Sequence, residues 1–363
     1  MSQDSADDIV PAPRKGRGAA TNRTGRYEAL HKEAVDDGWP GSGESRPPLR
    51  TQLGIDAARR VISRNDSPDV AFELSVNPYR GCEHGCSYCF ARPTHAYLGL
   101  SPGLDFETRL FHKPDAPTRL ADELAHPDYV CSPIALGINT DAYQPVERRT
   151  ELTRSLLEVC LAYRQPISIV TKSALVERDA DLLSEMAGLG LAQVFFSVTT
   201  LDGTLARALE PRASAPKRRL EAMSRLSAAG VPSGVLFAPV IPALNDHEME
   251  QVLHAAAEAG ASGAGYVMLR LPREVKPLFT EWLQAHAPGR AEHVLSLLRQ
   301  MHGGREYEAE FGVRMRGRGV FADLVAQRFR AARRREGLDR GLPPLETGHF
   351  SVPPRSGDQL SLL

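Results

Sequence analysis

The chain has 363 residues, of which 42% are hydrophobic and 25% charged, a composition typical of a globular protein with one sizeable core. The formal net charge of -1 excludes a whole-molecule field that would by itself attract nucleic acid, so such binding needs a local basic patch. The five cysteines are an odd number, which argues against a secreted disulfide framework. No apolar stretch approaches the ~20 residues of a membrane span, which argues against a membrane protein. We therefore expect a cytoplasmic protein with no membrane partner.

Residues 1–65 are rich in glycine, proline, serine and charge, which predicts an extended N-terminal arm that wraps the body. From Ala71 onward, short apolar runs alternate with amphipathic stretches, the pattern of repeated β-strand and α-helix units. The predicted strands are Ala71–Val76, Pro133–Ile138, Ile167–Thr171, Gln193–Val198, Ser233–Ala238 and Gly265–Leu269. The predicted helices include Arg149–Tyr163, Arg178–Ala187, Lys217–Ala229 and Glu248–Ala259, and left-handed caps are expected at Gly230 and Gly260.

Six strands, each followed by a helix, predict an α/β fold: a partial (β/α)6 TIM-like barrel that spans residues 66–290. In parallel α/β folds, ligands bind at the carboxyl ends of the strands. Residues 291–336 form a basic, helical C-terminal extension in this prediction. Residues 337–363 are rich in proline and glycine and predict a flexible tail.

Three cysteines, Cys82, Cys86 and Cys89, occur within eight residues, directly after the first predicted core strand. This spacing offers three thiolates, one fewer than a closed structural zinc site or a fully ligated iron-sulfur cluster requires. One coordination position is therefore left open for chemistry. The alternative is a zinc knuckle with His84 as fourth ligand, although His84 lies closer to both neighbouring cysteines than zinc ligands usually do.

The run GCEHGCSYCFAR resembles the signature of the radical S-adenosylmethionine (SAM) superfamily. The resemblance implies that the three cysteines hold a [4Fe-4S] cluster, that S-adenosyl-L-methionine chelates its fourth iron, and that an electron from the cluster cleaves the sulfonium to give a 5′-deoxyadenosyl radical. It also implies an electron donor such as flavodoxin or ferredoxin. Tyr88 stands where the family usually has an aromatic residue, and Gly81 and Gly85 give the loop the freedom to wrap a cluster.

The segments after the later strands, GINTDAYQPVE, VTKSALVERD, SVTTLD and LEPRASAPKRRLEAM, resemble the DNA repair photolyase-like branch of that superfamily, which includes spore photoproduct lyase. The likeness runs from Asn77 to Asp246, and the cysteine segment is close to the pattern of one uncharacterised bacterial subfamily. Membership of this branch implies a lyase-like repair reaction on damaged DNA. A radical SAM enzyme acting on a protein or a small metabolite is the alternative.

S-adenosylmethionine presents a carboxylate, a ribose and an adenine that each need a partner in a dry site. By the resemblance, Lys172 and Ser197 match cofactor contacts, Lys172 for the carboxylate and Ser197 for the carboxylate or the ribose. Thr140, Asp141 and Arg212 are further candidates. For both Lys172 and Arg212, pairing with surface carboxylates is the alternative interpretation.

Two features depart from the family pattern. The Gly-Gly-Glu common after the second strand is replaced by Asn139–Asp141. Spore photoproduct lyase returns a hydrogen atom through a cysteine near this strand end, where this chain has Ile138 and Asn139. Cys131 lies before the strand; it is the alternative hydrogen-atom donor, although buried cysteines are usually inert. The sequence assigns no catalytic residue, and we do not expect thymine-dimer reversal by the lyase's route.

The C-terminal region adds two predictions about partners. Arg314–Arg335 contains eight arginines and one acidic residue, a composition compatible with phosphate contacts on DNA or with a solvated helix face. Gln359–Leu363, QLSLL, resembles the peptide by which bacterial repair proteins dock on the replication sliding clamp; the alternative is an apolar end that packs on the body. A hypothesis of another class is a non-catalytic metal-binding adaptor tethered to that clamp.

Overall fold

A computed structural model of the protein describes residues 13–28 and 49–354. Its centre is a seven-stranded sheet in the order β10-β9-β8-β7-β6-β3-β2, in which only β2 is antiparallel to its neighbour. The strands are β2 (Ile62–Arg64), β3 (Leu74–Val76), β6 (Ile134–Leu136), β7 (Ile167–Thr171), β8 (Ala192–Ser197), β9 (Ser233–Val240) and β10 (Gly263–Met268). Because the six parallel strands neighbour one another in chain order, their carboxyl ends meet at one edge of the sheet.

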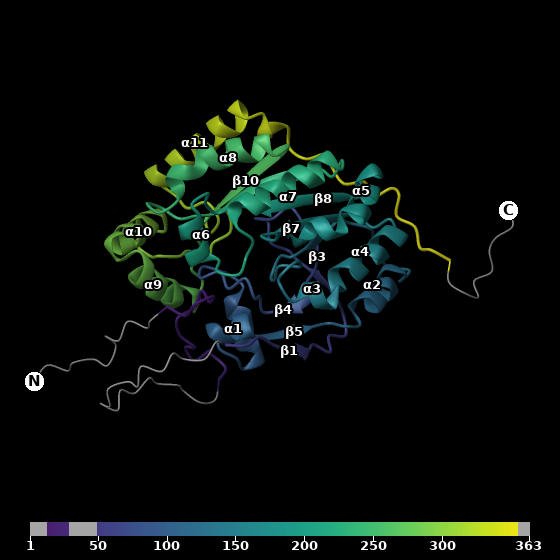
Figure 1. Ribbon diagram of the computed structural model, residues 1–363, viewed down its shortest axis with the longest axis horizontal. Helices are drawn as coiled ribbons and strands as arrows, with labels where there is room; N and C mark the ends of the chain where they lie inside the picture. Colours follow the sequence, from purple (N-terminus) through teal and green to yellow (C-terminus); the bar gives the residue numbers. More distant parts are fainter. Residues whose placement is uncertain (1–12, 29–48, 355–363) are drawn as a thin grey trace, which may run out of the picture.

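Helices connect the parallel strands and cover the outer side of the sheet (Figure 1). The connecting helices are α2 (Ala116–Leu124), α4 (Leu152–Ala162), α5 (Ala180–Gly188), α7 (Pro216–Ala228) and α8 (Met249–Glu258). Shorter helical turns follow the carboxyl ends of the strands: α3 (Glu147–Thr150), η2 (Ala174–Asp179), α6 (Gly203–Leu209) and η3 (Asp246–Glu248). The short turns therefore surround the edge at which a ligand is expected.

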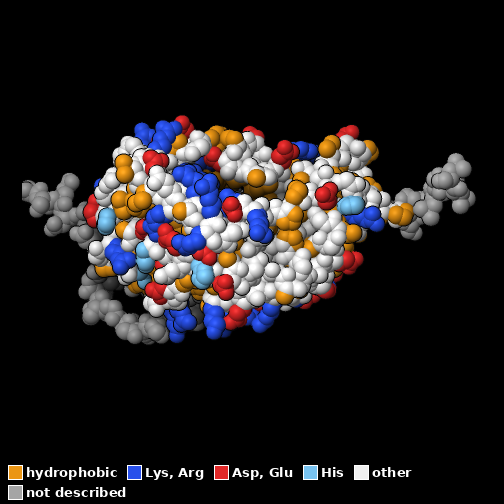
Figure 2. Space-filling model, turned by 90° about the horizontal axis from the view of Figure 1, so that it is seen from above, with side chains coloured by type: hydrophobic (Ala, Val, Ile, Leu, Met, Phe, Trp, Pro, Cys, Tyr) orange, Lys and Arg blue, Asp and Glu red, His pale blue; other side chains and the backbone are white. Residues whose placement is uncertain are grey.

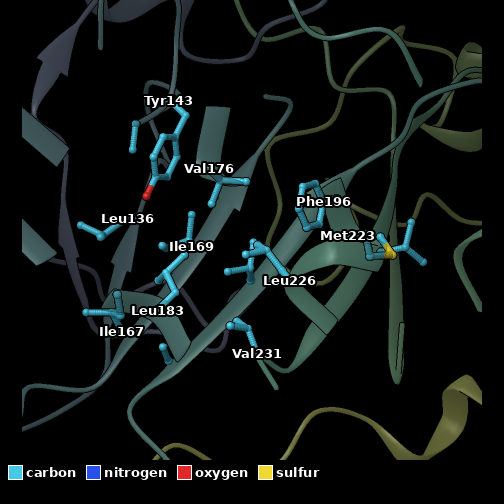
Figure 3. Close-up of a cluster of buried hydrophobic side chains, with 14 of the residues drawn as sticks. Leu136, Tyr143, Ile167, Ile169, Val176, Leu183, Phe196, Met223, Leu226 and Val231 are labelled. Atoms are coloured by element: carbon cyan, nitrogen blue, oxygen red, sulfur yellow. The ribbon is translucent and has the colours of Figure 1, made fainter. Parts of the chain in front are cut away.

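The core lies between the sheet and these helices. Ile167 and Ile169 alternate along β7 and are fully buried, and Phe196 of β8 lies in the same cluster as Met223 and Leu226 of α7 (Figure 3). Each such side chain contributes roughly 1.5–3 kcal/mol by leaving water. Apolar side chains recur every two residues in the strands and about every 3.6 residues in the helices. This spacing therefore determines which face of each element is buried in the core.

The predicted fold class is confirmed. Each of the six expected core strands is present, and the predicted Ile167–Thr171 coincides with β7 at both ends. Gly230 and Gly260 end α7 and α8 with φ values of 83° and 87°, the left-handed caps that were expected. Within the described residues β10 and β2 do not pair, so the sheet stays open as a partial barrel.

A second, three-stranded sheet contains the strand that leads into the cysteine segment. It consists of β1 (Gln52–Ile55), β5 (Arg109–His112) and β4 (Tyr79–Arg80), with α1 (Leu104–Thr108) and the helical turn η1 (Arg92–Leu98) beside it. Both β1 and β2 come from the span expected to be an extended arm. The arm therefore supplies one strand to each sheet.

The C-terminal region contains α9 (Val275–His286), α10 (Pro288–Met301), α11 (Val320–Arg335) and the turn η4 (Leu338–Arg340). The chain then runs along the body up to residue 354, which differs from the expected flexible tail (Figure 1). The reason is that Phe350 packs against Tyr129 at 5.3 Å between ring centroids, and the Ser351 amide donates to the Tyr163 carbonyl at 3.0 Å. Gln359–Leu363 lies outside the described residues. None of the described helices has the length and apolarity to cross a membrane.

Candidate functional site

The cysteine loop, residues 81–89, follows β4 of the three-stranded sheet. It lies near the edge of the seven-stranded sheet at which the parallel strands end, since Tyr88 contacts Lys172 just after β7. Cys82 and Cys86 are buried and Cys89 is half-buried. The Cys82 amide donates to the Phe106 carbonyl at 2.9 Å, and the Cys89 amide donates to the Cys86 carbonyl at 3.2 Å. The loop therefore curls back on itself, and its three thiols are close enough for each to influence the pKa of another.

Two glycines make this curl possible, as predicted above. Gly81 and Gly85 have φ values of 77° and 67°, a left-handed conformation that residues with a side chain avoid. A Cβ atom on Gly85 would also lie 2.7 Å from the Glu107 Oε2 atom. Glycine is therefore required at this position for two independent reasons.

A buried ion pair supports the loop from behind, and sequence reasoning assigned no role to either partner. The Arg92 and Glu107 side chains are both 0% exposed and meet at 2.6 Å. Arg92 also donates to the carbonyl oxygens of Gly85 and Cys86 at 3.2 and 2.9 Å. Glu107 accepts the amide of Ala19 at 2.8 Å, so the pair joins the loop to the N-terminal arm. The only sequence signal was the position of Arg92, three residues after the last cysteine.

The thiols of Cys82 and Cys86 are buried, and the charges of Lys172 and Arg219 act on Cys86. Burial, and then the charge of Glu210, raise the pKa of Cys86 to about 12, while the Lys172 ammonium opposes that shift. Burial also raises the pKa of Cys82. Buried thiols of this kind become thiolates only when a metal ion compensates the charge. Without a compensating positive charge, these thiols therefore stay protonated and unreactive.

Tyr88 anchors the loop to the end of β8. Its hydroxyl donates to Glu210 and lies 3.1 Å from the Thr199 hydroxyl, and Glu210 is also paired with the buried Arg219. Burial alone would raise the pKa of Glu210, but the charges of Arg219 and Lys172 outweigh it, so the pKa of Glu210 is lowered. The Lys172 ammonium lies 5.9 Å from the centre of the Tyr88 ring. Within the described residues Lys172 forms no ion pair, which leaves its charge available to a ligand.

Asp141, after β6, holds the loops around it rather than pointing into open space. Its carboxylate accepts the Thr171 hydroxyl at 2.8 Å and the Lys172 amide at 2.7 Å, and it lies 3.4 Å from the Nδ1 atom of His84. Burial works against ionisation, yet His84 and these donors lower the pKa of Asp141 to about 2. The neighbouring Thr140 hydroxyl donates to the Tyr79 carbonyl at 3.2 Å. Both residues therefore position the strand ends on which Lys172 is carried.

The remaining predicted residues have protein partners. Ser197 is buried at the end of β8, and its hydroxyl donates to the Ala238 carbonyl at 3.1 Å. Arg212 pairs with Glu83, between the first two cysteines, at 3.1 Å. The structure thus brings Tyr88, Lys172 and the three cysteines together, while Arg212 lies on the other side of the loop, where its ion pair covers Glu83.

The donor set fits an iron-sulfur cluster. Three soft thiols lie near one another, the Lys172 charge acts on Cys86, and the buried Ser87 hydroxyl, between Cys86 and Cys89, has no hydrogen-bond partner among the described residues. In the described part of the chain, no three His, Cys, Asp or Glu side chains converge as tightly as a single metal ion requires. The three cysteines of a cluster each bind a different iron, so they need not converge on one point.

The fold and the site together define a class: a partial barrel with a three-cysteine loop at the carboxyl ends of its strands. The family model of the radical SAM superfamily matches residues 76–256. An uncharacterised protein of Mycobacterium tuberculosis is 39% identical over 228 residues, which cover 61% of this chain and 67% of that protein. The chain belongs to the radical SAM superfamily and is an enzyme of that class. Membership implies an iron-sulfur cluster and S-adenosylmethionine as cofactors.

Further similarities agree with this assignment. An uncharacterised protein of Methanocaldococcus jannaschii is 28% identical over 191 residues, 53% of this chain and 68% of that protein. A structure of spore photoproduct lyase with bound AdoMet and dinucleoside spore photoproduct has a TM-score of 0.55, 17% identity, and coverage of 78% of each chain. Another lyase structure gives a TM-score of 0.52 and 18% identity, covering 78% of this chain and 77% of the lyase. At this level of identity the likeness to the lyase concerns the fold.

Proposed function

We propose that this enzyme uses a [4Fe-4S] cluster, held by Cys82, Cys86 and Cys89, to cleave S-adenosylmethionine reductively, and that it acts on damaged DNA in a lyase-like reaction. The observation that carries the first part is the placement of the cysteine loop. The loop lies beside Lys172 at the carboxyl ends of the strands, where parallel α/β folds bind ligands, and Lys172 has no ion-pair partner among the described residues. The loop leaves one iron of such a cluster without a cysteine, which is the position a chelating cofactor needs.

Each nearby side chain has a role that follows from its contacts. When bound, the cluster and cofactor together supply an electron and a carbon radical. Lys172 offers an ammonium to the cofactor carboxylate, and Tyr88 presents a ring fixed by Glu210 and Thr199. The oxygen of Ser197 retains lone pairs for a ribose hydroxyl while it donates to Ala238. Asp141 and Thr140 hold the strand ends in place.

Two observations support a nucleic-acid substrate. The first is the fold shared with spore photoproduct lyase, which has been solved with a bound dinucleoside spore photoproduct. The second is the basic segment Arg314–Arg335, whose helix α11 packs beside α8 (Figure 1). The molecule seen from above in Figure 2 carries a group of Lys and Arg side chains on its surface. Arg314, Arg318, Arg328 and Arg335 form ion pairs with carboxylates, so half of the eight arginines are neutralised.

Three of the other arginines line one hollow. Arg316, Arg330 and Arg333 surround a cavity of about 370 Å³ with Asp323 at its rim, and Arg316 stacks on Tyr266 with the guanidinium carbon 4.1 Å from the ring centre. Stacking fixes the guanidinium, so less entropy is lost when it contacts a phosphate. The basic segment thus offers arginines that are available to a nucleic-acid backbone, although fewer than the sequence suggested.

The hydrogen-atom donor of the lyase has no counterpart at the same place. Cys131 lies before β6, at the amino end of the strand and therefore away from the cysteine loop. Burial raises the pKa of its thiol to about 11, and the thiol contacts Gln165 at 3.6 Å. We assign Cys131 no catalytic role.

The test of the proposed chemistry is a product assay on anaerobically reconstituted protein. We expect about four irons per chain and release of 5′-deoxyadenosine after reduction. Cys86→Ala abolishes that release, whereas the control Cys131→Ala retains it, because Cys86 belongs to the cysteine loop and Cys131 does not. Stoichiometric zinc in place of iron, or intact S-adenosylmethionine in the presence of reductant, contradicts the proposal.

The proposal includes partners in the bacterial cytoplasm. A low-potential donor such as flavodoxin or ferredoxin supplies the electron. Gln359–Leu363 docks the enzyme on the sliding clamp, which a pull-down with purified clamp tests: Leu360→Ala removes the interaction if the peptide carries it. A substrate screen that gives turnover with a protein or small metabolite, and none with lesion-containing DNA, favours the alternative substrate classes.

A further inference from the structure

A second arginine-rich hollow adjoins the cysteine loop from outside. Its volume is about 500 Å³, within the range of small-ligand sites. It is lined by Leu49, Arg50, Thr51, Glu83, Pro145, Val146, Arg148, Arg149 and Arg212. Four arginines thus face one glutamate, and that glutamate lies between Cys82 and Cys86. The hollow and the metal-binding loop therefore share a wall.

Glu83 compensates the charge of only one of the four arginines, Arg212. Glu83 pairs with Arg212 at 3.1 Å and accepts the Thr51 hydroxyl at 2.6 Å. Arg50, Arg148 and Arg149 have no carboxylate partner within the described residues, and all three are exposed. Three positive charges are left over in a space that can hold a small anion.

The two neighbouring arginines are carried by a firmly anchored turn. Glu147, which begins α3, is 0% exposed, pairs with Arg178 at 2.7 Å and accepts the Thr153 amide at 3.1 Å. The α3 backbone is therefore fixed from inside while Arg148 and Arg149 extend outward. On the opposite wall, Arg17 holds residue 49 through a 2.6 Å hydrogen bond to the Leu49 carbonyl. Both walls of the hollow have fixed backbones.

We propose that this hollow binds a phosphate group of the substrate, with Arg148 and Arg149 as the principal contacts and Arg50 as a supporting charge. A guanidinium presents two parallel N–H groups that match two phosphate oxygens, and several guanidiniums can share one phosphate. The inference rests on the proposed function, since it names the group by which a nucleic-acid substrate is held beside the radical-generating site. A polynucleotide and a free nucleotide both provide that phosphate.

The experiment compares two double variants of the reconstituted enzyme. Arg148→Gln/Arg149→Gln removes the principal contacts. Arg59→Gln/Arg60→Gln is the matched control, because it removes two exposed neighbouring arginines that do not line the hollow and form no ion pair in the described structure. Both variants change the net charge equally, so a general electrostatic effect appears in both. Equal iron content in the variants shows that the loop still folds.

Fluorescence anisotropy measures the binding of a short fluorescein-labelled single-stranded DNA. We expect Arg148→Gln/Arg149→Gln to weaken DNA binding about tenfold. The slope of log K against log salt should also fall by about one unit, because a protein with fewer phosphate contacts releases fewer counterions when it binds DNA. The control retains the wild-type affinity and slope. Isothermal titration calorimetry measures the direct binding of inorganic phosphate and deoxyadenosine monophosphate. If both bind wild type and not the variant, while DNA binds neither protein, the site stands and its phosphate comes from a free nucleotide.

Three outcomes overturn the inference. The inference fails if DNA binds equally to wild type and to Arg148→Gln/Arg149→Gln. It also fails if the control Arg59→Gln/Arg60→Gln loses as much DNA affinity as Arg148→Gln/Arg149→Gln. If DNA binding is retained while binding of reduced flavodoxin is lost, the hollow is a docking surface for an acidic protein. The proposed function is tested separately, because wild-type enzyme that binds the DNA but releases no 5′-deoxyadenosine contradicts the chemistry and leaves the phosphate site intact.

Discussion

At the scale of single residues, the site depends on buried charges that are paired. Arg92 donates to the Gly85 and Cys86 carbonyls and to Glu107, and neither charged side chain of this pair reaches solvent. A buried ion pair adds little to the free energy of unfolding compared with an apolar pair of equal size. The loss of one partner is nevertheless strongly destabilising, because it leaves an uncompensated buried charge. Arg92 is therefore a positioning residue for the cysteine loop.

Arg92→Met should destabilise the protein by about 3–5 kcal/mol and reduce iron incorporation, because Glu107 is left buried and unpaired. Arg109→Met is the matched control: Arg109 is 48% exposed and 4.0 Å from Asp105, so about 1 kcal/mol or less is expected. Urea denaturation and iron analysis measure both effects. The double variant Arg92→Met/Glu107→Leu should recover part of the lost stability, and no recovery would mean that Arg92 acts through its carbonyl contacts alone.

At the scale of elements, the cysteine loop is a strand-to-helix connection with two left-handed glycines. Such a connection brings three thiols near one another only if the backbone turns sharply before and after Glu83 and His84. Neither propensity nor hydrophobic pattern favours this path, and the hydrogen bonds to Phe106 and Leu209 hold it. The loop is therefore the part of the site that is most sensitive to backbone substitutions.

Gly85→Ala should lower iron content at least severalfold, since the new Cβ atom meets the Glu107 carboxylate at 2.7 Å and the φ of 67° is unfavourable for alanine. Gly188→Ala, in α5, is the control, because a Cβ atom at that position would have no neighbour within 4 Å and its φ is ordinary. It should be neutral or stabilise by up to about 1 kcal/mol. Iron analysis and thermal denaturation compare the two variants, and a Gly85→Ala protein with full iron content would refute this account of the loop.

At the scale of the whole molecule, segments far apart in the chain enclose the site. Residues 13–28 lie on the cysteine loop, where the amides of Gly18 and Ala19 donate to Glu107 at 3.1 and 2.8 Å. The approach is so close that a Cβ atom on Gly18 would lie 1.7 Å from the Gly85 carbonyl oxygen. The arm thus shields a loop that the barrel alone would leave open.

Deletion of residues 1–28 should leave the helical content of the barrel unchanged and shorten the life of the cluster in air, because water and oxygen reach the loop once the arm is gone. Far-UV circular dichroism and the decay of the cluster absorbance measure these two properties. Gly18→Ala, which forces the arm away without removing it, should have the same effect on decay. Equal decay rates in all three proteins would show that the arm gives no protection.

Much of the site could be predicted from the sequence, because its key features are local. Cysteine spacing and the glycines at 81 and 85 are properties of one short segment, and the strand ends that carry Lys172 and Asp141 follow from hydrophobic periodicity. The ion pair of Arg92 with Glu107 and the network around Glu210 could not be found in this way. Arg92 and Glu107 are separated by 15 residues and Tyr88 and Glu210 by 122, beyond the reach of any helix or strand period, and no local pattern encodes which buried charges meet.

The sequence by itself determined the order of strands and helices, the parallel sheet and the three-thiol loop, because each depends on the spacing of residues along the chain. Only the tertiary structure decided which charges remain available. Folding paired Arg212 with Glu83 and half of the basic segment with carboxylates, and left Lys172, Arg148 and Arg149 without such partners in the described part of the chain. The reason is physical: a charge is cancelled or retained by its neighbours in space, and those neighbours are chosen by packing.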